Sequence, residues 1–146
     1  MTTDVDTLEQ NKKVVLHLLD NWVDPDVFDL VTTEDFELIV EADPAFTGVA
    51  GAQPKAQALA ARRAMAGMYT SAMDIRSVTA EADRVVVDLI TDSRIKDANG
   101  VDRPYINRVC FVCQVHDGKI TQVREYGDTA YCVGTFPDLY KADAHT

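Results

Sequence analysis

The sequence predicts an α+β fold in which helices come first and strands come last. Apolar residues recur at helical spacing in the first half of the chain, and alternate with polar residues at strand spacing from about residue 69 onward. The segment 104–128 reads as two long strands joined by a tight turn. A chain of 146 residues can bury roughly 70% of its unfolded surface, so we expect one domain over residues 1–146, with residues 135–146 as a C-terminal tail.

The first third of the chain predicts two helices. Over residues 7–22, apolar side chains including Leu8, Leu18 and Trp22 share one helical face. Asp24 is a favourable N-cap and Pro25 suits a first helical position, which together predict a short second helix.

A strand follows, because Phe36, Leu38 and Val40 alternate with polar or outward positions. Asp43 comes just past its end, and Pro44 favours an exit into a loop. We therefore expect the Asp43 carboxylate to point toward the sheet as a candidate acid or base.

An alanine-rich segment over residues 54–68 predicts a third helix, on which Arg62 and Arg63 are interpreted as solvent-exposed. Strands are predicted over residues 73–80 and 84–96. The pairs Asn99-Gly100 and Asp117-Gly118 are typical of chain reversals, the second within the long hairpin.

The register of the hairpin decides which way Glu125 points. A three-residue turn over residues 116–118 would place Glu125 opposite Val109 on an apolar face. A two-residue turn would place it beside Arg108 as an ordinary surface residue. The residues alone leave both registers open.

In the first register, Glu125 is a carboxylate among apolar side chains, where desolvation would raise its pKa and suit it to general acid/base catalysis. Asn107 would orient a substrate carbonyl or hydroxyl, unless it only ends a strand. Tyr69 suits a pocket rim, although core packing is the usual fate of tyrosine. The predicted substrate-binding residues are Asn107, Trp22, Tyr69, Val109, Phe111 and Val123, and the predicted catalytic residues are Glu125 and Asp43.

Composition excludes several classes of partner. The net charge of −10, from 24 acidic and 14 basic residues, disfavours nucleic acid and anionic membranes and favours a small-molecule ligand. No apolar run is long enough for a membrane span or leader, and an odd count of three cysteines suits a reducing compartment, so we expect a cytoplasmic protein. Scattered histidines and the lack of a glycine-rich phosphate loop predict no metal and no cofactor.

The segment GVDRPYINRVCFVCQVHDGKITQVREYGDTAY resembles the C-terminal half of the SnoaL-like proteins in the NTF2-like superfamily, and the order of elements is similar over residues 8–133. The resemblance implies a cone, in which the N-terminal helices pack in the concave face of a curved mixed or antiparallel sheet around a deep hydrophobic pocket. It also implies a homodimer formed sheet to sheet, and favours the inward direction for Glu125.

Relatives in this superfamily include ketosteroid isomerases, limonene epoxide hydrolases, polyketide cyclases and phenazine-biosynthesis proteins. The ending VREYGD is similar to the epoxide hydrolase segment whose aspartate activates water, and that position here is Glu125. Ser93 and Ile95 stand where those hydrolases have an Arg-x-Asp pair. Of the ketosteroid isomerase residues, only the base before proline has a counterpart, Asp43.

These observations lead to three hypotheses. The first is a cofactor-independent enzyme of the isomerase, cyclase or dehydratase type, acting by proton transfer on a small, largely apolar, ring-bearing molecule. The second is a non-catalytic binding or accessory protein that uses the same pocket. The third is a structural dimer whose pocket is filled by its own side chains.

Overall fold

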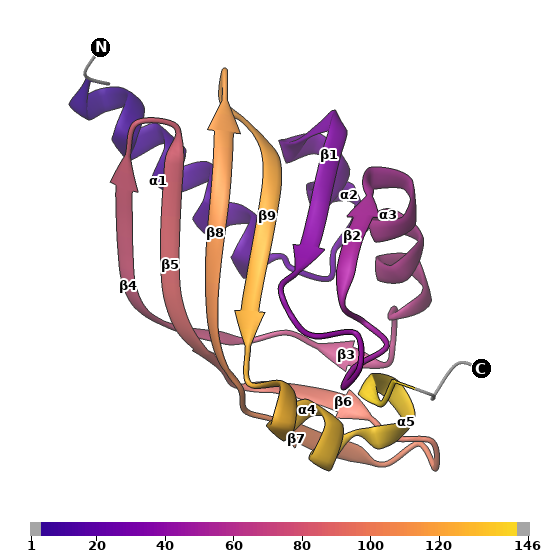
Figure 1. The fold of residues 1–146 in the computed structure, drawn as a ribbon. Coiled ribbons are helices and arrows are strands. Elements are labelled where there is room, and N and C mark those ends of the chain that lie inside the picture. The colour runs from indigo at the N-terminus through magenta and orange to yellow at the C-terminus, as the bar shows by residue number, and fades with distance from the viewer. Residues whose placement is uncertain (1–3, 143–146) are drawn as a thin grey trace.

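The largest element of the fold is a curved six-stranded sheet with the strand order β2-β1-β9-β8-β5-β4 (Figure 1). The computed structural model describes residues 4–142. Neighbouring strands are antiparallel except for β1 and β9, which are parallel, so the sheet is mixed as predicted. Its strands are β1 (Thr32–Val40), β2 (Gly51–Pro54), β4 (Met73–Glu81), β5 (Arg84–Thr91), β8 (Arg108–His116) and β9 (Lys119–Gly127).

Three helices cover the concave face of this sheet: α1 (Val5–Asp20), α2 (Pro25–Val31) and α3 (Lys55–Ala64). Helix α1 contacts β4, β5 and β9, and α3 contacts β1 and β2. The predicted cap of α2 is confirmed, because the Asp24 carboxylate accepts hydrogen bonds from the amides of Asp26 and Val27. The apolar faces of these three helices and the inward-facing residues of the strands form one core cluster.

A second, three-stranded sheet closes one end of the domain. It contains β3 (Tyr69–Thr70), β6 (Ser93–Lys96) and β7 (Asp102–Tyr105), and it is covered by α4 (Thr129–Thr135) and α5 (Pro137–Tyr140) (Figure 1). The single strand predicted over residues 84–96 was therefore wrong in one respect, since the chain leaves the large sheet at Asp92. The facing of its side chains is nevertheless continuous, and residues from Val85 to Ile95 alternate between buried and more exposed.

The hairpin of β8 and β9 has neither of the predicted registers. Its turn is the two-residue type, with Asp117 and Gly118 both at positive φ, as a type I′ turn requires. Beyond the turn the pairing shifts by one residue, which leaves Thr121 as the extra residue of a β-bulge. As a result Glu125 lies opposite Phe111 on the concave side. The turn is that of the two-residue alternative, the facing of Glu125 is that of the three-residue alternative, and the partner expected with that facing, Val109, is wrong.

Within residues 4–142, none of the helices combines the length and the apolar character needed to cross a membrane. The C-terminal segment after β9 folds back on the domain as far as it is described. The Phe136 side chain is buried, and the backbones of Thr47 and Lys141 pair in an isolated antiparallel β-bridge. Residues 143–146 of the predicted tail lie outside the described residues.

Candidate functional site

A cavity of about 220 Å³ opens between the concave face of the large sheet, helix α3 and the C-terminal helices. Its lining is mostly apolar and strongly aromatic. The aromatic residues in its wall are Trp22, Tyr69, Tyr105, Phe111 and Tyr140. Such an apolar chamber with few polar groups is the usual form of a small-molecule site.

Glu125 lies in the wall of this cavity. Its strand, β9, lies between β8 and β1, and Glu125 is opposite Phe111 on β8 and Val40 on β1. Its backbone carbonyl accepts a hydrogen bond of 2.9 Å from the amide of Glu41. Burial raises the pKa of the Glu125 carboxyl to about 7, because desolvation penalises the charged form more than the positive charge of Arg62 favours it. At neutral pH this carboxyl is therefore present in both protonation states.

Arg62 is a second charged residue in this wall, and the prediction that it is exposed to solvent was wrong. Its side chain is 2% exposed. The guanidinium donates to the carbonyls of Trp22 (Nε, 2.9 Å) and Ala58 (Nη1, 3.1 Å), and it lies 4.5 Å from the Trp22 ring centre and 3.8 Å from that of Phe28. Desolvation lowers the pKa of Arg62 to about 10, so the group stays cationic at neutral pH.

The exposed neighbour Arg63 on the same helix fits the prediction of a solvated arginine. Arg62 differs because Lys55, Ala58 and Arg62 recur at offsets of three and four residues and form the buried face of α3. Lys55 is paired on this face with Asp29 at 3.0 Å. Alanines occupy several faces of α3, so their spacing does not mark Arg62 as buried.

Asn107 also lines the cavity, but its amide is committed to the protein. Its Nδ2 donates to the Tyr105 hydroxyl (3.1 Å) and to Cys132 Sγ (3.3 Å), and its Oδ1 accepts from the Asp128 amide (3.2 Å). The backbone amide of Asn107 donates to Thr91 Oγ1 at 2.7 Å. Asn107 thus joins the point where the two sheets separate to the start of α4, instead of presenting a free amide to a ligand.

We expect Asn107→Ala to lower the free energy of unfolding by about 2 to 3 kcal/mol, because the Asp128 amide loses its side-chain acceptor and the Tyr105 hydroxyl and Cys132 Sγ lose a buried donor. Urea denaturation measures the change. Asn99→Ala, in an exposed turn, is the control and should change stability by less than about 0.5 kcal/mol. Equal stabilities for the two variants would contradict a structural role for Asn107.

The remaining predicted site residues divide into two groups. Trp22, Tyr69 and Phe111 line the cavity with Glu125 and Asn107. Val109 and Val123 are 2% and 0% exposed and pack in the main core cluster, so they do not line it.

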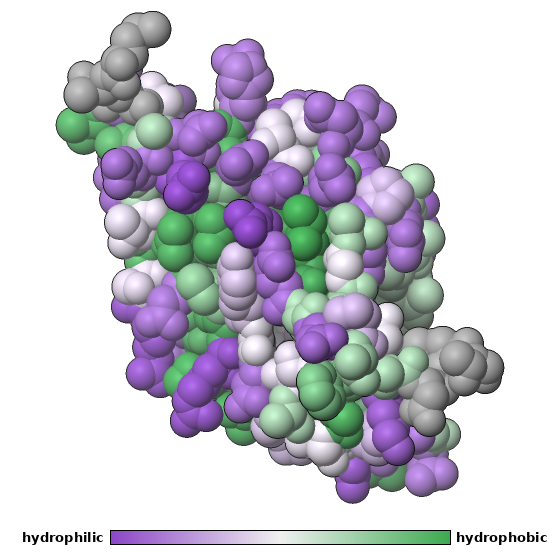
Figure 2. Space-filling model, viewed as in Figure 1, coloured by the Kyte–Doolittle hydropathy of each residue, from purple (hydrophilic) through white to green (hydrophobic). Residues whose placement is uncertain are grey.

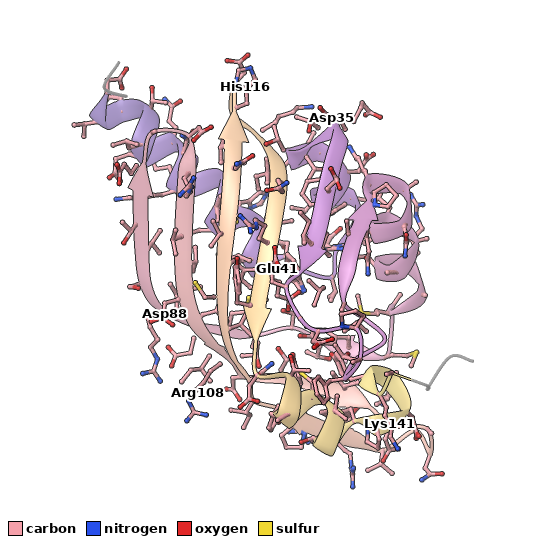
Figure 3. The ribbon with its side chains drawn as sticks, in the orientation of Figure 1. Asp35, Glu41, Asp88, Arg108, His116 and Lys141 are labelled. Atoms are coloured by element: carbon pink, nitrogen blue, oxygen red, sulfur yellow. The ribbon has the colours of Figure 1, made fainter. Side chains whose placement is uncertain are left out.

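Asp43 is also absent from the cavity wall. Its carboxylate is exposed in the loop after β1 and accepts a hydrogen bond of 2.8 Å from the Ala45 amide. An Asp before proline readily forms such a local turn, and this contact holds Asp43 away from the sheet. Glu41, at the point where β1 ends (Figure 3), also lines the cavity, and its carboxylate pairs with Arg124 at 3.1 Å.

No family model and no curated protein matches this chain. Solved structures do. A SnoaL-like protein from Jannaschia sp. CCS1 is 22% identical, covers 99% of this chain and 98% of its own, and has a TM-score of 0.69. An NTF2-like protein from Burkholderia xenovorans LB400 is 25% identical, with coverages of 83% and 91% and a TM-score of 0.62. This chain has the NTF2-like fold.

An LEH-like epoxide hydrolase from M. tuberculosis shares the NTF2-like fold at 21% identity, with coverages of 84% and 85% and a TM-score of 0.59. In the present NTF2-like chain, the Ser93 hydroxyl donates to the Ala72 carbonyl at 3.0 Å and Ile95 is buried in the second core cluster. Neither residue supplies a carboxylate to the cavity.

The aromatic side chains leave space inside the NTF2-like cone. Trp22 and Phe111 pack against each other with ring centres 5.0 Å apart, yet the cavity beside them persists. This contradicts the hypothesis of a pocket filled by its own side chains. Within residues 4–142, no group of three or more His, Cys, Asp and Glu side chains is placed to hold a metal ion.

Proposed function

We propose that the protein is a cofactor-independent acid/base catalyst of the isomerase, cyclase or dehydratase type, acting on a small, largely apolar, ring-bearing molecule. One observation carries this proposal: Glu125 stands in the wall of an apolar cavity with a pKa of about 7. A general acid/base works best when its pKa lies near the working pH. In an ordinary surface position a glutamate would be fully ionised at that pH.

In the simplest reaction of this type, the Glu125 carboxylate takes a proton from a carbon next to a substrate carbonyl. The electron pair of the broken C–H bond moves onto the carbonyl oxygen and forms an enolate. The protonated Glu125 then returns the proton to another carbon of the conjugated system, and the carbonyl re-forms in an isomer. Arg62 supplies positive charge near the enolate, and the apolar wall excludes water.

The second candidate is a binding protein without chemistry. It is favoured by the state of Asn107, whose amide is occupied by Tyr105, Cys132 and Asp128 and is not free to orient a substrate. Under this alternative the same cavity would retain a ligand without changing it.

Exchange of carbon-bound hydrogen in D₂O separates the two candidates without knowledge of the substrate. A panel of single-ring ketones is incubated with the protein, and deuterium uptake next to the carbonyl is followed by NMR. The enzyme predicts exchange faster than in buffer for those ketones that bind. Ketones that bind with no acceleration of exchange would contradict the catalytic proposal and support the binding protein.

We also propose that the protein forms a homodimer through the outer face of the large sheet. Half-buried apolar side chains gather across the middle strands of this face (Figure 2), and Tyr126 beside them is 41% exposed. The apolar residues are Ile39, Val86, Ile90, Cys110 and Val112. A solution mass of 16.1 kDa by light scattering, the mass of one chain, would contradict this proposal.

A further inference from the structure

Arg62 is a buried cation with an unused hydrogen-bond donor. Two of its nitrogens donate to backbone carbonyls, but Nη2 has no partner among the described residues. The salt bridges of the described residues do not include one to Arg62. Buried charges in proteins are normally paired, so an unpaired guanidinium in a cavity wall indicates a missing anionic partner.

The other ionisable groups that face this part of the cavity do not supply that anion. Burial raises the pKa values of the surrounding hydroxyl and thiol groups, so these are neutral at pH 7: Tyr69, Tyr105, Cys132 and Tyr140. Glu41 at the rim is already paired with Arg124. Glu125 is partly protonated at this pH. With Glu125 neutral, the cavity therefore carries one uncompensated positive charge, that of Arg62.

The cavity volume limits the size of the ligand. An apolar cavity of about 150 Å³ holds one benzene ring. The present cavity, at about 220 Å³, therefore accommodates a single ring with a small substituent. Trp22 and Phe111 provide aromatic surface for such a ring, and the Trp22 ring also lies against the Arg62 guanidinium. One ligand can therefore place its ring against these side chains and its substituent at Arg62.

We propose that the cavity binds a single-ring carboxylate, with the ring against Trp22 and Phe111 and a carboxylate oxygen accepting the hydrogen bond of Arg62 Nη2. As a statement about the substrate, this inference rests on the proposed function. Nη2 exposes less than 1 Å² of surface, so the proposed contact requires a neighbouring side chain to move when the ligand binds. The protein's net charge of −10 slows the approach of an anion, but it is screened over about 10 Å and does not determine affinity inside the cavity.

The bound carboxylate lies near Glu125, and two negative charges in one apolar site repel each other. Binding is therefore coupled to protonation of Glu125. Above pH 7 the Glu125 proton must be regained before the anion binds, so the dissociation constant rises by roughly tenfold per pH unit, whereas below pH 6 it is constant. A carboxylate substrate therefore meets protonated Glu125, which gives a proton first, as a dehydration needs. The proton abstraction described for ketones starts from the Glu125 carboxylate instead.

Titration calorimetry with benzoate, and with the neutral isostere benzamide, tests the site. At pH 6 benzoate is expected to bind wild-type protein more tightly than benzamide. Arg62→Met removes the donor and keeps an unbranched side chain, and we expect it to weaken benzoate binding about tenfold to a hundredfold. Arg63→Met changes an exposed arginine of the same helix and is expected to bind benzoate like the wild type.

Glu125→Gln tests the coupling and keeps the test decisive if Arg62→Met does not fold. In this variant the affinity for benzoate is expected to be independent of pH between 6 and 9, and the proton uptake seen in wild type at pH 8 is expected to disappear. Equal affinities of wild type for benzoate and benzamide, or unchanged benzoate binding by a folded Arg62→Met, would overturn the inference.

The outcome also separates this inference from the proposed function. Benzoate binding through Arg62 without any hydrogen exchange on ring compounds would leave the anion site intact and contradict catalysis. Exchange on neutral ketones with no preference for benzoate over benzamide would support catalysis and contradict the anion site.

Discussion

Replacing Glu125 with glutamine is expected to lower the rate of hydrogen exchange on any accepted ring ketone by about 10²-fold to 10⁴-fold, the usual contribution of a general acid/base. Glutamine is close in shape and cannot exchange a proton. The variant should bind neutral ligands much as the wild type does, because the raised pKa of Glu125 means that the cavity already holds a neutral group at this position. NMR detection of deuterium uptake measures the rate, and calorimetry measures binding.

The pH dependence of the same reaction identifies the ionising group. Proton abstraction needs the carboxylate, so wild-type exchange should rise with pH and reach half its maximum near pH 7. Glu37→Gln, on an exposed position of β1, is the control and should keep both rate and profile. A half-maximum near pH 4.5 would show that Glu125 is not desolvated during the reaction.

The Glu125→Gln variant is also expected to be more stable than wild type at alkaline pH. The folded-state pKa of about 7 lies above the ordinary value of 4.5, so the folded protein binds this proton more tightly than the unfolded chain. Wild-type stability therefore falls as the pH rises from 4.5 through 7, and the full penalty, roughly 3 kcal/mol at 1.36 kcal/mol per pH unit, is present above pH 8. Glutamine carries no such penalty.

Urea unfolding of wild type and variant at pH 4 and pH 8.5 measures this difference. The two proteins should be nearly equal in stability at pH 4, where the carboxyl is protonated in both states. Glu37→Gln should show no comparable gain at pH 8.5, because its side chain is exposed. An equal gain at both pH values would mean that packing, and not ionisation, distinguishes glutamine from glutamate.

The sequence predicts the class of fold, because alternation along strands survives local irregularity. The residues alone left the facing of Glu125 open, and the family resemblance favoured the inward direction. Val85, Val87 and Leu89 are each 0% exposed, as the period-two pattern indicates. The short strand β2 was not predicted, since its four residues lie in a loop-like segment with little alternation. The division into two sheets was not predicted either. It depends on hydrogen bonds between Thr91 and Asn107, which are distant in sequence.

Part of the candidate site could be predicted, because Glu125 is a carboxylate that shares a strand face with the apolar Val123. Arg62 could not, for a physical reason. Helix α3 is so rich in alanine that no apolar stripe marks its inner face, and charged residues are then assumed to face water. The energetic compensation for burying Arg62 comes from the Trp22 carbonyl and the ring of Phe28, and neither contact is local in sequence.

The bulge at Thr121 has a consequence for mutational tolerance. It gives β9 one residue more than β8 between the turn and Glu125, and this extra residue sets Glu125 opposite Phe111 on the concave side. Substitutions at position 121 leave the count unchanged. Regular pairing of the same residues, without a bulge, would set Glu125 opposite Cys110 on the outer side of the sheet. Deletion of residue 121 would instead keep Gln114 opposite Gln122 and Phe111 opposite Glu125, so the acid would stay on the concave side.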